Sequence, residues 1–229
     1  MSRREGGYMQ TLALLYMGAG IVSTISGLVK GLDSEIEVIN LVNDGILPAA
    51  QKNGNELTST AFEQLMHSLM TAELAGADAM MVTCSSISEF VDYAQPFARI
   101  PVFKIDEPMF LEALSRGTKI GVAATVGTTL KPSLRQLKRL AEKNGKEVEI
   151  DSVLIEPAYQ AFLQGNINLH NELIQNTLKE LCDRNDAVCL AQASMLSVVQ
   201  TMPEEYQRKI LSSPASGVKR VVDYLRSVR

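Results

Sequence analysis

The chain is poor in the residues from which disulfide frameworks and metal sites are built. Its 229 residues include three cysteines and two histidines. The cysteines, Cys84, Cys182 and Cys189, are odd in number and far apart, which argues against a disulfide framework and favours a reducing compartment. Neither His67 nor His170 belongs to a HxxxH or HxH pattern, and no CxxC pair is present. We therefore expect no metal site.

The chain also lacks a net positive charge and a long apolar run. Its formal net charge is −4, which gives no electrostatic reason to expect nucleic acid or anionic lipid as a partner. The most apolar stretch, Leu12–Val29, is interrupted by glycines and serines, and a membrane span needs about 20 apolar residues. This stretch also lacks the small-residue cleavage site of a signal peptide. We expect a cytoplasmic protein that binds neither nucleic acid nor membrane.

Short apolar runs alternate with longer segments that carry apolar residues at helical spacing. Two such segments, Leu57–Leu74 and Leu130–Asn144, are expected to be helices, and each is closely followed by a glycine that suits a helix end. The apolar runs are nearly continuous, as in parallel strands that are buried on both faces. This alternation predicts an α/β fold with parallel sheets. The runs expected to form strands are Leu12–Tyr16, Ile36–Leu41, Ala79–Thr83, Val102–Lys104, Lys119–Ala123, Glu147–Val153 and Ala187–Ala191.

The sequence repeats itself weakly, at one fixed offset. Ala77–Ser86 matches Asn185–Ser194, and Leu12–Ala19 matches Ile120–Gly127. Both pairs are shifted by the same 108 residues, as the starting positions 77 and 185 show. In each pair a strand is followed by a turn of small residues. Agreement of two segments on one offset indicates a duplicated architecture.

The duplication predicts two pseudo-symmetric domains, each a parallel-sheet α/β sandwich. The last helix, near Ser216–Arg226, is expected to pack onto the first half and make that domain discontinuous. Ligands bind beyond the carboxyl ends of the strands in such sheets, so we expect one active site between the domains, lined by loops of both. The expected domains are residues 1–105 with 214–229, and residues 106–213.

Cys84 is the leading candidate for chemistry. It follows the expected strand Ala79–Thr83 and precedes a helix expected to begin near Ile87, with Ser85, Ser86 and Ser88 as capping residues. A thiol at a helix N-terminus has a lowered pKa, and a thiolate can abstract a proton from carbon or attack an electrophile. The alternative is a small buried hydrophobe at a strand end, which is common for free cysteine.

A second loop, Thr125–Thr129, follows the expected strand Lys119–Ala123 and opens a helix. Its backbone N–H groups and hydroxyls could hold a carboxylate or a phosphate. Simple capping is the alternative, with Pro132 in the first helical turn. No GxGxxG or GxxxxGKS pattern is present, so a small carboxylate is favoured over a nucleotide.

Gln192 occupies the position in the repeat that corresponds to Cys84. An amide is not a proton-transfer base, but it donates and accepts hydrogen bonds. Its alternative role is packing or capping at the next helix. Cys189 falls inside a strand and Cys182 near a helix end, so both are expected to be structural. The candidate substrate-binding residues in these loops are Met17, Ser85, Ser86, Thr125, Val126, Gly127, Thr128, Thr129, Ala193 and Ser194.

Three segments carry a family resemblance that extends over nearly the whole chain. They are Thr83–Ser88 (TCSSIS), Gly121–Thr128 (GVAATVGT) and Leu190–Met195 (LAQASM). They resemble the segments ACNTAS, GxxATxGT and LGCAGM of the aspartate/glutamate/hydantoin racemase superfamily. The middle segment is the most specific match. The third departs from the pattern at its central residue, where Gln192 stands in place of cysteine.

The resemblance implies a cofactor-independent, homodimeric enzyme that acts on a small carboxylate or amino acid. Racemases of this group use two cysteines, one on each face of the substrate carbon, and the resemblance places Cys84 at the first of these positions. It gives Gln192 the second, so the chain resembles an atypical member. The implied function is a racemase-like isomerase with Cys84 as acid and base. The alternatives are a one-base isomerase, a decarboxylase or other lyase, and a binding protein without catalysis.

Overall fold

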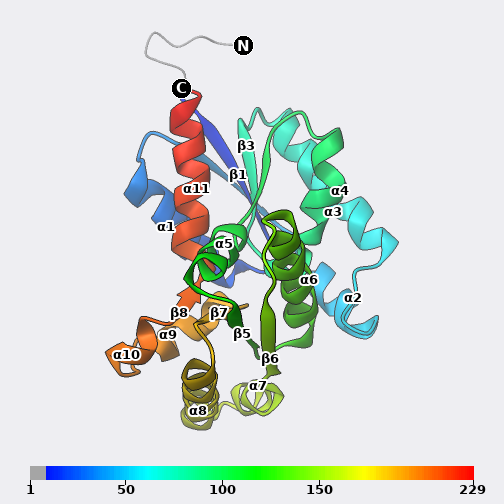
Figure 1. Ribbon diagram of the computed structural model, residues 1–229. Helices are drawn as coiled ribbons and strands as arrows, with labels where there is room; N and C mark the ends of the chain where they lie inside the picture. The colour runs from blue at the N-terminus through cyan, green and yellow to red at the C-terminus, as the bar shows by residue number, and fades with distance from the viewer. Residues whose placement is uncertain (1–8) are drawn as a thin grey trace. The chain divides into compact units, whose positions relative to one another are not determined.

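A computed structural model describes residues 9–229, which form two compact units (Figure 1). The first unit consists of two segments, the chain up to Ile105 and the C-terminal segment Pro214–Arg229. The second unit is Asp106–Ser213. Elements of the first unit are β1 (Thr11–Tyr16), η1 (Ala19–Ile21), α1 (Val22–Leu32), β2 (Glu37–Val42), α2 (Ile46–Lys52), α3 (Ser59–Leu74), β3 (Ala79–Val82), η2 (Ser85–Ile87), α4 (Glu89–Ala94), η3 (Gln95–Phe97), β4 (Val102–Lys104) and α11 (Ser213–Ser227).

The second unit repeats much of this order. Its elements are α5 (Glu107–Arg116), β5 (Lys119–Ala124), α6 (Gly127–Lys143), β6 (Glu149–Leu154), α7 (Glu156–Leu163), α8 (Ile167–Arg184), β7 (Ala187–Leu190), η4 (Ala193–Met195), α9 (Leu196–Val199), α10 (Glu204–Gln207) and β8 (Ile210–Ser212).

Each unit is built on a parallel sheet of four strands, and the two sheets have the same topology. The strand order is β2-β1-β3-β4 in one and β6-β5-β7-β8 in the other. The register is also the same, since Leu12 lies opposite Ala79 in the first sheet and Ile120 opposite Ala187 in the second. These pairs are separated by the offset of the sequence repeat. The predicted α/β fold class is confirmed.

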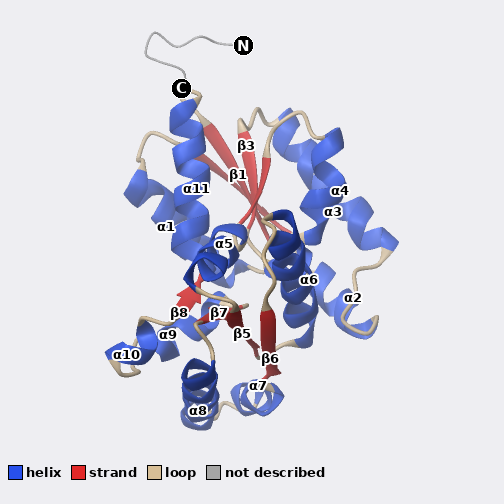
Figure 2. Ribbon diagram, in the orientation of Figure 1, coloured by secondary structure: helices blue, strands red, loops and turns tan. Residues whose placement is uncertain are grey.

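Helices cover both faces of each sheet, as Figure 2 shows for each unit by itself. In the first unit, alternate residues of β1 point to opposite faces: Leu15 packs in a core with α3 and α4, and Leu14 packs in a core with α1 and α11. In the second unit, Ala123 faces α7, α8 and α9, while Val122 faces α5 and α6. Burial on both faces explains the continuous apolar runs of the central strands.

The predicted strands are confirmed to within a few residues, but one strand was missed and the expected position of Pro132 is wrong. The strand β8 was not predicted, because three residues at the sheet edge carry too little apolar pattern. Pro132 does not lie in the first helical turn, since α6 already begins at Gly127 and contains Pro132 further along. Within residues 9–229, no helix is both long and apolar enough to cross a membrane.

One close contact secures α11 against the first unit. A Cβ atom added at Gly217 would lie 2.3 Å from the carbonyl oxygen of Ile105 and 2.8 Å from its Cγ1. Ile105 belongs to the same core cluster as Val218 and Val221 of α11. The helix therefore reaches the chain segment that leaves β4 only because residue 217 has no side chain.

We predict that Gly217→Ala lowers the free energy of unfolding by about 1–3 kcal/mol, because the added methyl group forces the helix away from its core. Gly27→Ala in α1 is the matched control, since nothing lies within 4 Å of the added atom. There the ordinary helix preference of alanine should raise stability by up to about 1 kcal/mol. Urea unfolding midpoints measure both changes. Equal shifts for the two variants would contradict this description of α11.

Candidate active site

Cys84 stands directly beyond the carboxyl end of β3. The preceding residue, Thr83, is fixed to the neighbouring strand β1, because its backbone N–H and its Oγ1 both donate to the carbonyl oxygen of Leu15, at 3.0 and 2.8 Å. Cys84 itself is extended, with φ −132° and ψ 122°, and its carbonyl accepts from the N–H of Ile87 at 3.1 Å. Its side chain is partly exposed and lies against the core beneath α3 and α4.

Gln192 stands at the equivalent place beyond β7. Ala191 donates its N–H to the carbonyl of Ala123 at 2.9 Å, so the strand end is again fixed to its neighbour. The backbone of Gln192 has φ −136° and ψ 126°, nearly the values of Cys84, and its carbonyl accepts from the N–H of Met195 at 3.2 Å. The two backbones are therefore the same at this position, and the side chains differ.

The side chain of Gln192 joins two of the predicted loops within the second unit. Its Oε1 atom accepts three hydrogen bonds: from the N–H of Thr125 at 2.6 Å, from Thr125 Oγ1 at 3.1 Å and from the N–H of Val126 at 3.2 Å. The structure thus brings together Thr125, Val126 and Gln192 from the sequence-based set. Sequence analysis missed this contact, although both loops were expected at strand ends; the adjacency of β5 and β7 is what makes it possible.

The other predicted residues differ in how accessible their side chains are. Buried side chains belong to Ser85, Ser86, Thr125, Thr128 and Thr129. Met17 is also buried, within the core beneath α3 and α4. Partly or fully exposed positions are Val126, Gly127, Ala193 and Ser194. Exposed backbone and hydroxyl groups are therefore concentrated around Gly127 and Ser194 in the second unit.

The expected helix after Cys84 is shorter and less regular than predicted. A three-residue 3₁₀ helix, η2, comes first, and α4 then spans only six residues. The N-cap residues, Cys84 for η2 and Ser88 for α4, make no side-chain cap bond, so the predicted capping by Ser88 is wrong. Glu89 and Asp92 lie in the first turn of α4.

The other two cysteines are buried in the core of the second unit. Cys182 on α8 is 1% exposed and Cys189 on β7 is fully buried. Burial raises the pKa of the Cys182 thiol to about 11 and raises the pKa of Cys189 further still. Both remain neutral thiols near pH 7, so Cys84 is the cysteine that solvent and reagents can reach.

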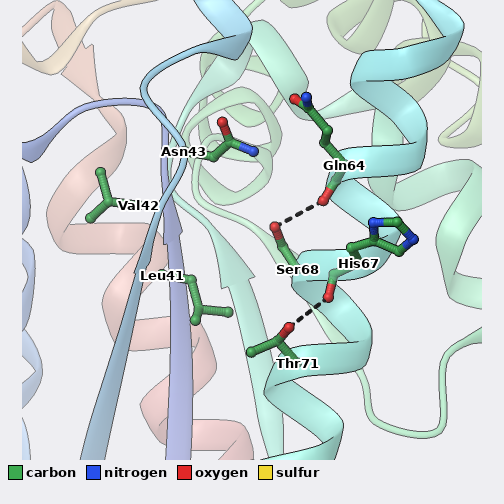
Figure 3. Close-up of a pocket in the computed structure, with 7 residues that line it drawn as sticks. All are labelled: Leu41, Val42, Asn43, Gln64, His67, Ser68 and Thr71. Atoms are coloured by element: carbon green, nitrogen blue, oxygen red, sulfur yellow. Dashed lines mark hydrogen bonds between the residues drawn. The ribbon is translucent and has the colours of Figure 1, made fainter.

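The first unit also has an open hollow of about 350 Å³ between the end of β2 and α3 (Figure 3). The two hydroxyls of this hollow donate hydrogen bonds to backbone carbonyls of α3 (Figure 3). Ser68 Oγ donates to the carbonyl of Gln64 at 3.0 Å, and Thr71 Oγ1 donates to the carbonyl of His67 at 2.8 Å. None of the predicted site residues lines it. Among residues 9–229, no group of three or more His, Cys, Asp or Glu side chains is placed to hold a metal ion.

Solved structures with the same fold include racemases and a racemase homologue. A glutamate racemase from Francisella tularensis, in complex with D-glutamate, aligns with a TM-score of 0.73 at 14% identity, over 96% of this chain and 82% of that one. An allantoin racemase from Klebsiella pneumoniae aligns at 0.68 and 15% identity, over 96% and 88%. An aspartate racemase homologue from Pyrococcus horikoshii aligns at 0.65 and 16% identity, over 96% and 100%.

Sequence comparison identifies the family. No curated protein matches the chain. The family model described as Asp/Glu/Hydantoin racemase, however, matches residues 7–221. That match takes in Cys84, the Thr125–Thr129 loop and Gln192, and agrees with the resemblance carried by the three sequence segments. The chain therefore belongs to the Asp/Glu/hydantoin racemase family and is an enzyme of the isomerase class.

Proposed function

We propose that this enzyme is a cofactor-independent, one-base isomerase of small carboxylates or amino acids, with Cys84 as the base and acid. The proposal is supported most by a comparison of the two residues that follow the equivalent strands β3 and β7. Cys84 and Gln192 have the same backbone geometry, but only one of them carries a group that can transfer a proton.

Accessibility and chemistry favour Cys84 as the reactive group. It is the one partly exposed thiol, while burial keeps Cys182 and Cys189 protonated. Its backbone is held rigidly by the bonds of Thr83 to β1, and a fixed position is what proton transfer to carbon requires. A thiolate needs no cofactor to remove a proton next to a carboxylate if the resulting charge is stabilised.

The proposed reaction has two steps. The Cys84 thiolate takes the proton from the substrate α-carbon, forming an S–H bond while the C–H electron pair moves into the carboxylate as an enediolate. The thiol then returns a proton to the delocalised anion, which restores the thiolate. When the thiol first exchanges its proton with solvent, return to the same face of the same carbon gives isotope exchange without an isomer, and return to another carbon of a conjugated substrate gives an isomer. No oxidant, reductant or second reactant is consumed.

Gln192 makes a symmetric two-base mechanism unfavourable. An amide neither takes nor gives a proton near neutral pH, so it cannot deliver one to the face of the carbon opposite Cys84. Its proposed role is to orient the substrate and stabilise the enediolate by hydrogen bonding. Hydroxyl and backbone groups of Ser85, Ser86, Gly127, Thr128 and Thr129 are proposed to hold the substrate carboxylate. We further propose a cytoplasmic homodimer.

The reactivity of Cys84 is tested by alkylation of the native enzyme with iodoacetamide near neutral pH. We expect one rapid modification, at Cys84, because only this thiol is accessible and the other two are buried neutral thiols. Mass spectrometry of intact protein and of peptides gives the rate at each site. Cys84→Ser should abolish the rapid phase. If Cys84 reacts no faster than Cys182, the proposed base is inert.

The reaction itself is tested by incubating L- and D-aspartate and L- and D-glutamate with the enzyme in deuterated water. We expect deuterium to enter the α-position of one enantiomer with retention of configuration, because only one face of the carbon meets a base. Proton NMR follows exchange, and chiral chromatography follows inversion.

Cys84→Ser should slow this exchange by about 100-fold or more, whereas Cys182→Ser should leave it intact. Exchange that survives Cys84→Ser would remove Cys84 from the mechanism. Inversion as fast as exchange in the unmodified enzyme would show that a second group donates from the opposite face.

A further inference from the structure

The orientation of the Gln192 amide is determined by its partners. The backbone N–H groups of Thr125 and Val126 can only donate, and both point at the same atom of the amide. That atom must be the oxygen, because the amide nitrogen carries no free acceptor site. The third bond, from Thr125 Oγ1, reinforces this arrangement. A rotation of the amide by half a turn would break both backbone bonds, because two donors would then face each other.

With the oxygen held in this way, the amide nitrogen is the polar atom that remains for a ligand. Gln192 is partly exposed, and among residues 9–229 its hydrogen bonds are the three to Oε1, with none from Nε2. An amide nitrogen offers two N–H donors and accepts nothing. At this position the loop therefore presents hydrogen-bond donors only.

We propose that Gln192 is a specificity-determining residue, which selects a substrate bearing an oxygen acceptor, such as a carboxylate or carbonyl, at this position and rejects one bearing an ammonium group there. The three bonds to Oε1 make Thr125 and Val126 its positioning partners. This inference rests on the proposed function for the premise that Gln192 contacts the substrate. It adds which group of the substrate the Gln192 amide recognises.

Gln192→Glu is the sharpest variant, because it keeps the size and shape of the side chain. One carboxylate oxygen can accept the same three hydrogen bonds, and the other then replaces Nε2. The substitution changes a donor into a charged acceptor at one atom. We expect the affinity for succinate to fall about tenfold or more, and the affinity for putrescine, a diamine of matching chain length, to rise.

Isothermal titration calorimetry of the full-length enzyme with succinate and with putrescine measures both affinities. Gln160→Glu is the matched control, since Gln160 is an exposed residue of α7 in the same unit and gains the same charge. We expect Gln160→Glu to bind both probes as the unmodified enzyme does. A reversal of charge preference confined to Gln192→Glu is not expected from structural damage, which would weaken both probes.

A second pair of variants tests the positioning role without altering Gln192. Thr125→Val removes the Oγ1 bond and keeps the backbone donor, whereas Thr125→Ser keeps both. We expect Thr125→Val to weaken succinate binding about threefold or more and Thr125→Ser to restore it. Unchanged binding in Thr125→Val would show that the Oγ1 bond has no part in positioning the amide.

The possible failures are distinguishable. If the unmodified enzyme binds succinate and Gln192→Glu binds it equally well, the specificity role is wrong while the proposed function stands. If the unmodified enzyme binds no succinate, the specificity role is overturned, and the deuterium exchange tests the proposed function independently. If the titrations give the expected results but the unmodified enzyme catalyses no deuterium exchange, only the proposed catalysis is contradicted.

Discussion

The parallel pairing of the two central strands in each sheet decides which loops lie side by side. Because β1 pairs with β3 in the same direction, the loop that begins at Met17 and the loop that begins at Thr83 leave the sheet at one edge. The pairing of β5 with β7 does the same for Thr125 and Gln192. Every candidate residue owes its position to this constraint, and the near-identical backbone angles of Cys84 and Gln192 show how closely the two units repeat it.

On this repeated backbone the two units carry different chemistry. The first unit presents a partly exposed thiol, and the second presents an amide whose oxygen is saturated by Thr125 and Val126. A thiol exchanges protons with carbon, while a fixed amide stabilises negative charge on oxygen. This difference between equivalent positions is the basis of the proposed one-sided mechanism.

Much of this arrangement follows from the sequence, and what does not has identifiable physical causes. Continuous apolar runs identify the central strands because both faces of those strands are buried, and the fixed offset predicts the duplication. The strand β8 is too short to show a pattern. The helix after Cys84 is interrupted after three residues, which the serines at its start do not reveal. The contact between Gln192 and Thr125 joins loops 67 residues apart, and only the strand order brings them together.

The most direct measurement of the central claim is the stereochemical course of the reaction in Gln192→Cys. This substitution places a thiol at the end of β7. It also removes the amide oxygen that accepts the hydrogen bonds of Thr125 and Val126. If the amide is what confines proton transfer to one face, the variant should convert exchange with retention into exchange with inversion of the same substrate. Continued retention in a folded Gln192→Cys enzyme, or inversion already present in the unmodified one, would contradict the one-sided mechanism.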